Sequence, residues 1–202
     1  MNGQETEVKF HIHDLKKIEL HLLALNAQLI QPRVHEINLR FDTPNKELRN
    51  SSHVLRLRQD DKARFTFKGP SVETKGGVMS RKEIEFVVGD FESAKQFLEE
   101  LGFNVVVFYE KFRTTYQLNN THIMLDELPY GDFMEIEGEN SELIHNIADL
   151  LGLNWDAMIR AGYHALFEQA AGKYGLEPSQ LSFENLKNTK ISITDLNIIA
   201  AD

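Results

Sequence analysis

Residues 5–10 read ETEVKF, and in this stretch Glu5, Glu7 and Lys9 alternate with Val8 and Phe10. Successive side chains of a β-strand point to opposite faces, so the stretch predicts a strand with one charged face and one apolar face. A half-buried strand usually turns its apolar face to the core and its charged face to water. The fold depends on which of these two faces lies inside, and the patterns of the other strands indicate which one it is.

Composition limits the possible classes of protein. At 202 residues and 42% hydrophobic content, the chain can bury one core and form one domain, with or without an appendage. The absence of cysteine excludes disulfides and thiolate zinc sites. A formal net charge of -9, from 31 acidic and 22 basic residues, argues against nucleic acid as a partner. No apolar run approaches the roughly 18–20 residues needed to span a membrane, and no signal peptide is recognised, so we expect no membrane partner and a cytoplasmic location.

Periodicity predicts an α+β fold. Apolar stripes predict one helix after an N-cap at Asp14, extending to Leu29, others after N-caps at Asp90 and Ser141, and a final helix over 155–171. Alternation predicts eight strands, at 5–12, 34–42, 53–60, 63–69, 81–88, 105–118, 121–128 and 132–138. Eight strands joined mostly by short turns predict an antiparallel barrel or a strongly curved sheet. Residues 173–202 show little periodicity, so we expect a domain over 1–172 followed by a weakly attached C-terminal extension.

Charged residues recur two apart on almost every predicted strand, and they are sorted by sign. Acidic residues gather on 5–12, 81–88 and 132–138, whereas basic residues gather on 53–60, 63–69 and 105–118. A solvated face gives little reason for such sorting, because opposite charges across from one another are the stabilising arrangement. If the helices cover the apolar faces from outside, a closed barrel has its charged faces in the lumen.

Buried charges need partners, because each unpaired ion costs on the order of several kcal/mol. Clustered carboxylates suit a hard divalent cation, Mg²⁺ or Mn²⁺. Clustered arginine and lysine suit phosphate oxygens, and arginine offers paired donors in a fixed fork. A metal-bound polyphosphate is a ligand that would satisfy both groups.

The order of these motifs resembles the CYTH superfamily, the triphosphate tunnel metalloenzymes. The resemblance spans roughly residues 5–168 and rests on ExExK at Glu5, Glu7 and Lys9, followed by LRLR, FKG, EIE, EKFR, LDE and EIEG, with RFDTP at 40–44 and a late Tyr163. It implies an eight-stranded antiparallel tunnel with a charged lumen and outer helices. It also implies metal-dependent chemistry at a triphosphate, a small-molecule substrate.

The resemblance assigns roles to individual residues. The implied metal ligands are Glu5, Glu7, Glu135 and Glu137, with Asp126 as a further candidate, while Glu83 and Glu85 could bind a second metal or orient the bases. The implied triphosphate clamp is Arg56, Arg58, Lys68, Lys111 and Arg113, to which Lys9 could belong; Arg40 is either a further substrate contact or a surface residue. Glu5, Glu7 and Lys9 are the implied catalytic residues.

Three functions remain open at this point. The preferred one is hydrolysis of inorganic, thiamine or nucleoside triphosphate, because it asks least of the site. The second is cyclisation of ATP to cyclic AMP and pyrophosphate by a class IV adenylyl cyclase, and the third is a non-catalytic polyphosphate or nucleotide-binding module. Thiamine recognition would need an aromatic platform, for which Tyr130 and Trp155 are available. The choice between Mg²⁺ and Mn²⁺, and between monomer and homodimer, also stays open.

Overall fold

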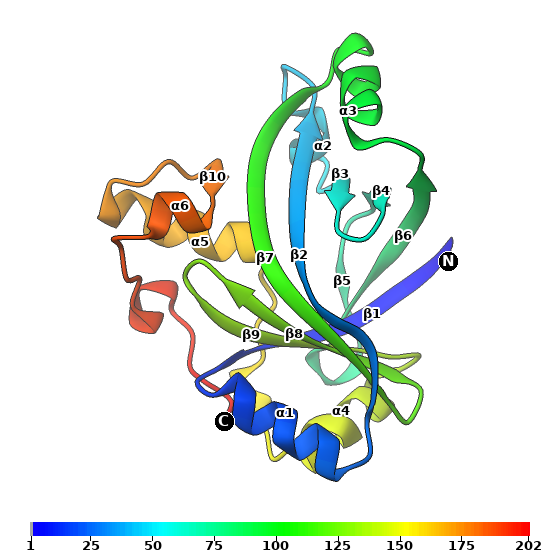
Figure 1. The fold of residues 1–202 in the computed structure, drawn as a ribbon, viewed down its shortest axis with the longest axis vertical. Coiled ribbons are helices and arrows are strands. Elements are labelled where there is room, and N and C mark those ends of the chain that lie inside the picture. Colours follow the sequence, from blue (N-terminus) through cyan, green and yellow to red (C-terminus); the bar gives the residue numbers. More distant parts are fainter. Residues whose placement is uncertain (1) are drawn as a thin grey trace.

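The computed structural model describes residues 2–202, and its main element is a ten-stranded sheet (Figure 1). Eight strands close into an antiparallel barrel in the order β1-β9-β8-β7-β2-β3-β4-β6, with β6 pairing back to β1. They are β1 (Asn2–Ile12), β2 (Gln28–Asp42), β3 (Val54–Gln59), β4 (Ala63–Lys68), β6 (Met79–Val88), β7 (Asn104–Leu118), β8 (Thr121–Leu128) and β9 (Gly131–Glu137). Short β5 (Val72–Glu73) pairs with β6, and β10 (Gln180–Leu181) pairs with β7. The predicted α+β barrel is confirmed.

The helices lie outside the barrel. They are α1 (Leu15–Ala24), α2 (Glu47–Asn50), α3 (Phe91–Glu100), α4 (Ser141–Leu150), α5 (Tyr163–Ala171) and α6 (Phe183–Leu186). The side chains of Asp14 and Asp90 cap α1 and α3, as predicted, each accepting a backbone N–H of the first turn. At α4 the predicted cap Ser141 is wrong by one residue, because Asn140 accepts the N–H of Leu143 at 2.9 Å.

The apolar faces of the strands lie under these helices. Val8 and Phe10 of β1 are buried in one core with Leu22 of α1 and Ile144 of α4. A separate core packs α3 against β2 and β3, with Leu57 fully buried in it. Because neighbouring side chains on a strand alternate, the charged residues between these apolar ones point into the barrel.

Two predicted helices differ from the structure. The first ends at Ala24 rather than near Leu29, because Asn26 adopts a left-handed conformation (φ 59°) and Leu29 belongs to β2. The predicted helix over 155–171 is divided, since only its second half forms α5. Its first half is a single 3₁₀ turn followed by an extended segment, in which Ile159 donates its N–H to the carbonyl of Lys9 at 2.8 Å.

The C-terminal segment 173–202 is packed closely, so the expectation of weak attachment is wrong. Its apolar residues Leu181, Leu186, Ile191 and Leu196 are buried in a core shared with α5 and β7. The Asp202 carboxylate accepts the N–H groups of His13 and Asp14 at 2.7 and 3.0 Å. Periodicity did not predict this packing, because the buried apolar residues of 173–202 have neither a helical nor a strand spacing. Whether 1–172 is a separate domain remains a prediction. Among the described residues, no helix has the length and apolar character needed to cross a bilayer.

This packing predicts that the C-terminal segment contributes to the stability of the barrel. Leu181→Ala removes a fully buried side chain and should lower the free energy of unfolding by about 2–5 kcal/mol. Ile199→Ala, at a position 56% exposed in the same segment, is the control and should have little effect. Chemical denaturation of both variants measures the difference, and equal stabilities would contradict the close packing.

Candidate active site inside the barrel

The barrel encloses a cavity of about 570 Å³. Its charged lining consists of six glutamates and nine basic side chains: Glu5, Glu7, Glu83, Glu85, Glu135 and Glu137, with Lys9, Arg40, Arg56, Arg58, Lys68, Arg81, Lys111, Arg113 and Arg160. These residues come from seven of the eight barrel strands and from the segment before α5. The structure therefore brings together every predicted site residue except Asp126.

Asp126 lies behind the cavity wall rather than in it. It is fully buried, and its oxygens accept from Lys111 Nζ at 3.0 Å, Arg113 Nε at 2.6 Å and the Tyr163 hydroxyl at 2.7 Å. A carboxylate already shared by two cations and a phenol is not available to a metal in the cavity. Asp126 instead fixes the position of the two bases on β7.

Acidic residues dominate one wall of the cavity. Strands β6, β1 and β9 are consecutive around the barrel, and Glu7 stands directly opposite Glu137 in the β1–β9 register. Burial, together with the charges of Glu5, Glu7 and Glu83, raises the pKa of Glu137 to about 7. A shift in this direction is expected where carboxylates crowd together without enough counter-charge.

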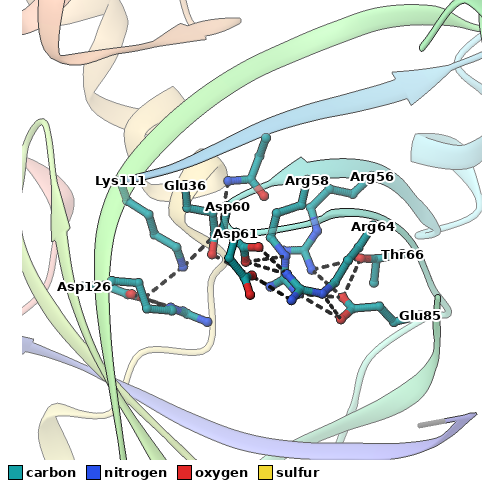
Figure 2. Close-up of polar contacts among 12 residues, drawn as sticks. Glu36, Arg56, Arg58, Asp60, Asp61, Arg64, Thr66, Glu85, Lys111 and Asp126 are labelled. Carbon is teal, nitrogen blue, oxygen red and sulfur yellow. Dashed lines mark hydrogen bonds and ion pairs between the residues drawn. The ribbon is translucent and has the colours of Figure 1, made fainter. Parts of the chain in front are cut away.

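Basic residues dominate the facing wall, on β3, β4 and β7. Most of them are held by carboxylates: Arg58 donates to both oxygens of Glu85 at 2.8 and 3.0 Å, and Lys68 Nζ lies 2.8 Å from Glu5. Figure 2 shows the contact between Arg58 and Glu85 together with those of Arg56, Arg64 and Lys111. The bases are thus ordered before any ligand binds.

The sequence analysis missed two residues of this network. Arg81 donates to Glu5 at 2.7 Å and to Glu7 at 3.3 Å. Glu36 is 1% exposed; it accepts from Asn38 and lies 3.6 Å from Lys111 and 3.8 Å from Arg58 (Figure 2). Although burial acts against ionisation, these cations hold the pKa of Glu36 well below its usual value. Alternation could have found both, since each lies an even number of residues from a predicted site residue.

Comparison with protein-family models shows which family the chain belongs to. The CYTH domain family matches residues 3–148, which contain the barrel except for Asn2, the first residue of β1. The chain belongs to this family. The CYTH match ends before Ile159 and Tyr163, although both line the cavity. A comparison with curated proteins gave no match.

Solved structures with the same fold include members from archaea, bacteria and plants. The PH1012 protein from Pyrococcus horikoshii is 28% identical, with a TM-score of 0.66, covering 79% of this chain and 96% of its own. A proposed adenylate cyclase from Vibrio parahaemolyticus is 19% identical, with a TM-score of 0.73, covering 82% of this chain and 98% of its own. A proposed adenylyl cyclase from Hippeastrum, described as having a dominant triphosphatase activity, is 19% identical, with a TM-score of 0.60 and coverage of 86% and 97%.

The donor set of this CYTH barrel fits a divalent cation. Among residues 2–202, no three acidic or histidine side chains are already arranged around a metal position. Glu7 and Glu137 nevertheless face each other; Glu137 makes no ion pair with a described residue, and Glu7 has only the 3.3 Å contact from Arg81. Mg²⁺ is commonly bound by one or two carboxylates, with water and substrate phosphates completing its shell. Two lightly paired carboxylates match that requirement.

Carboxylate crowding predicts a pH dependence of stability in the absence of divalent ions. Because the pKa of Glu137 is raised from 4.5 to about 7, folding favours its neutral form, and its contribution to stability is lost as the pH rises across this window. Glu137→Gln removes the titration and should raise the melting temperature at pH 8 relative to wild type, with a smaller difference at pH 5. Thermal unfolding in a chelator measures both. An unchanged difference across this range would contradict the crowding.

Proposed function

We propose that this CYTH protein is a divalent-metal-dependent phosphohydrolase whose triphosphate substrate binds inside the barrel. The observation that carries the proposal is the division of the barrel cavity into an acidic wall and a basic wall. A free metal ion would need only the first, and a free anion only the second. A triphosphate with its cation uses both at once.

The basic wall supplies donors suited to phosphoryl oxygens. Arg58 and Arg113 present guanidinium forks from β3 and β7, and Lys111 adds a point charge between them. Their present carboxylate partners keep these side chains extended into the cavity. Phosphoryl oxygens compete for the same N–H donors, so substrate binding exchanges internal ion pairs for contacts to the ligand.

The chain's contribution to the reaction is electrostatic. Phosphoryl transfer spreads negative charge over the transferring oxygens, and fixed cations aimed at those oxygens lower the barrier. Glu7 and Glu137 would hold the metal, which supplies charge neutralisation and a more acidic bound water. Lys9 is held by Glu135 at 2.9 Å, and its ammonium group lies 4.4 Å from the centre of the Tyr163 ring. It is thereby oriented toward the cavity beside Glu7.

We prefer hydrolysis of inorganic triphosphate to a reaction that depends on recognition of an organic group such as thiamine. Tyr130 and Trp155, the aromatic residues considered for a thiamine ring, lie outside the cavity lining and contact apolar cores. The described triphosphatase activity of the Hippeastrum protein supports the view that this fold accommodates hydrolysis. Inorganic triphosphate requires only the charged walls that are present.

The proposal predicts metal-dependent turnover that fails when an acidic-wall ligand is lost. Inorganic triphosphate, thiamine triphosphate and ATP are offered in parallel with Mg²⁺ or Mn²⁺, and the products are identified by ³¹P NMR. Glu7→Gln keeps the shape but removes a charge, so kcat/KM should fall at least about a hundredfold. Cyclic AMP from ATP would instead support a cyclase. Full activity in a chelator, or in Glu7→Gln, would contradict the site assignment.

A second prediction concerns the fork geometry of Arg58. Arg58→Lys keeps a cation near Glu36 and Glu85 but loses the paired donors, so kcat/KM should fall at least about tenfold while the melting temperature changes little. Arg33→Lys is the matched control, because Arg33 also donates to both oxygens of a carboxylate, that of Glu127, but at an exposed position away from the cavity. Equal activities of the two variants would show that Arg58 is not part of a phosphate clamp.

A further inference from the structure

Tyr163 lines the cavity, although it does not belong to a barrel strand. It is the first residue of α5, is 8% exposed, and lies beyond residue 148, where the CYTH match ends. The chain leads to it through Ile159, whose N–H is bonded to the carbonyl of Lys9. The hydroxyl of Tyr130 donates to the carbonyl of Tyr163 at 2.9 Å. A segment outside the family match therefore holds this ring in the cavity wall.

The Tyr163 ring contacts two ammonium groups. Nζ of Lys9 lies 4.4 Å from the centre of the ring, and Nζ of Lys111 lies 5.1 Å from it. A cation within about 6 Å of the centre of an aromatic ring is attracted by the negative face of the ring. Both lysines are candidate site residues, so one aromatic side chain touches a base on each of two strands.

Backbone pairing does not fix the distance between these two lysines. Lys9 is on β1 and Lys111 is on β7, and β9 and β8 lie between them in the strand order. Each lysine has a carboxylate partner of its own, Glu135 for Lys9 at 2.9 Å and Asp126 for Lys111 at 3.0 Å. The ring of Tyr163 is a contact that both ammonium groups share.

The hydroxyl of Tyr163 fixes the ring and stays protonated. It donates to Asp126 at 2.7 Å, to the same oxygen that accepts from Lys111. Burial, together with the charges of Asp126 and Glu135, raises the pKa of Tyr163 well above its usual value. A neutral phenol bonded to a buried carboxylate is not a proton acceptor at neutral pH. An effect of Tyr163 on turnover must therefore act through the groups that it touches.

An aromatic ring differs from a carboxylate as a partner for a lysine that binds phosphate. A carboxylate neutralises the ammonium group, and a phosphoryl oxygen has to displace it to take the same N–H donors. A ring carries no net charge, so it restrains the position of the ammonium group and leaves its positive charge for the ligand.

We infer that Tyr163 is a positioning residue, whose ring holds the ammonium groups of Lys9 and Lys111 at a fixed separation in the cavity. The inference rests on the proposed function and adds to it a residue from beyond the CYTH match. Removing the ring frees two bases at once. Because fixed cations lower the barrier only when they are aimed at the transferring oxygens, the loss should appear in kcat.

Tyr163→Leu and Tyr163→Phe separate the ring from the hydroxyl. Leucine removes the ring, so kcat for inorganic triphosphate should fall at least about tenfold. Phenylalanine keeps the ring and loses only the bond to Asp126, so kcat should stay within about threefold of wild type. Tyr116→Leu is the matched control, because Tyr116 is also buried and donates to a carboxylate at 2.7 Å, that of Glu19, but outside the cavity. It should change kcat less than about twofold.

A double-mutant cycle with Lys9 distinguishes positioning from a general loss of structure. If the ring acts on Lys9, Tyr163→Leu should cost at least about threefold less in a Lys9→Met background than in wild type. Equal costs in the two backgrounds would overturn the inference. A loss of kcat in Tyr163→Phe as large as that in Tyr163→Leu would also overturn it, because the effect would then belong to the hydroxyl.

NMR provides an arm that does not depend on turnover. The ring current of Tyr163 should shift the Cε proton signals of Lys9 and Lys111 upfield, and each signal is assigned by its absence from Lys9→Arg or Lys111→Arg. The shifts should persist in Tyr163→Phe and disappear in Tyr163→Leu, whereas unshifted signals in wild type would overturn the inference. If the shifts are present but wild type hydrolyses no triphosphate, the proposed function fails while the ring contact stands.

Discussion

Pairing between β1 and β6 is the constraint on which the rest of the structure depends. This pairing closes the sheet, and closure makes one face of every strand an interior. It also places the acidic faces of β6, β1 and β9 side by side, so their carboxylates are crowded by topology rather than by local sequence. The helices cover the outer apolar faces because those side chains point away from the barrel interior and are buried only by packing against helices.

The internal ion pairs are better understood as an ordered resting state than as a source of stability. Burying an ion pair costs about as much in desolvation as it gains, so the many pairs in the barrel are weak evidence for stabilisation. Their geometric effect is clearer. Asp126 and Glu36, behind and beside the cavity wall, hold Lys111 in place, and Glu85 holds Arg58. Arg40 has no carboxylate within 4 Å among the described side chains.

The sequence predicted the barrel because alternation over eight strands is a strong, local signal. Two helix caps were predicted because Asp14 and Asp90 directly precede apolar stripes. It also placed thirteen of fourteen candidate residues in the cavity lining. Pairing among the charges depends on register, which sequence spacing does not supply, so Asp126 was expected as a metal ligand although it pairs with Lys111 and Arg113. Glu36 was missed although alternation with Arg40 places it on the inner face of β2. The packing of Leu181 and Leu196 was missed because single apolar residues in loops and short turns have no period.

The central claim is that the interior of the barrel, with its two oppositely charged walls, binds a metal-bound triphosphate. The most direct measurement is a crystal structure of the wild-type protein grown with Mn²⁺ and triphosphate, with the cation located by its anomalous scattering. The account predicts a manganese peak within coordinating distance of Glu7 and Glu137, and phosphoryl density extending toward Arg58 and Arg40. Manganese and triphosphate found only on the outer surface, with the interior ion pairs unchanged, would contradict it.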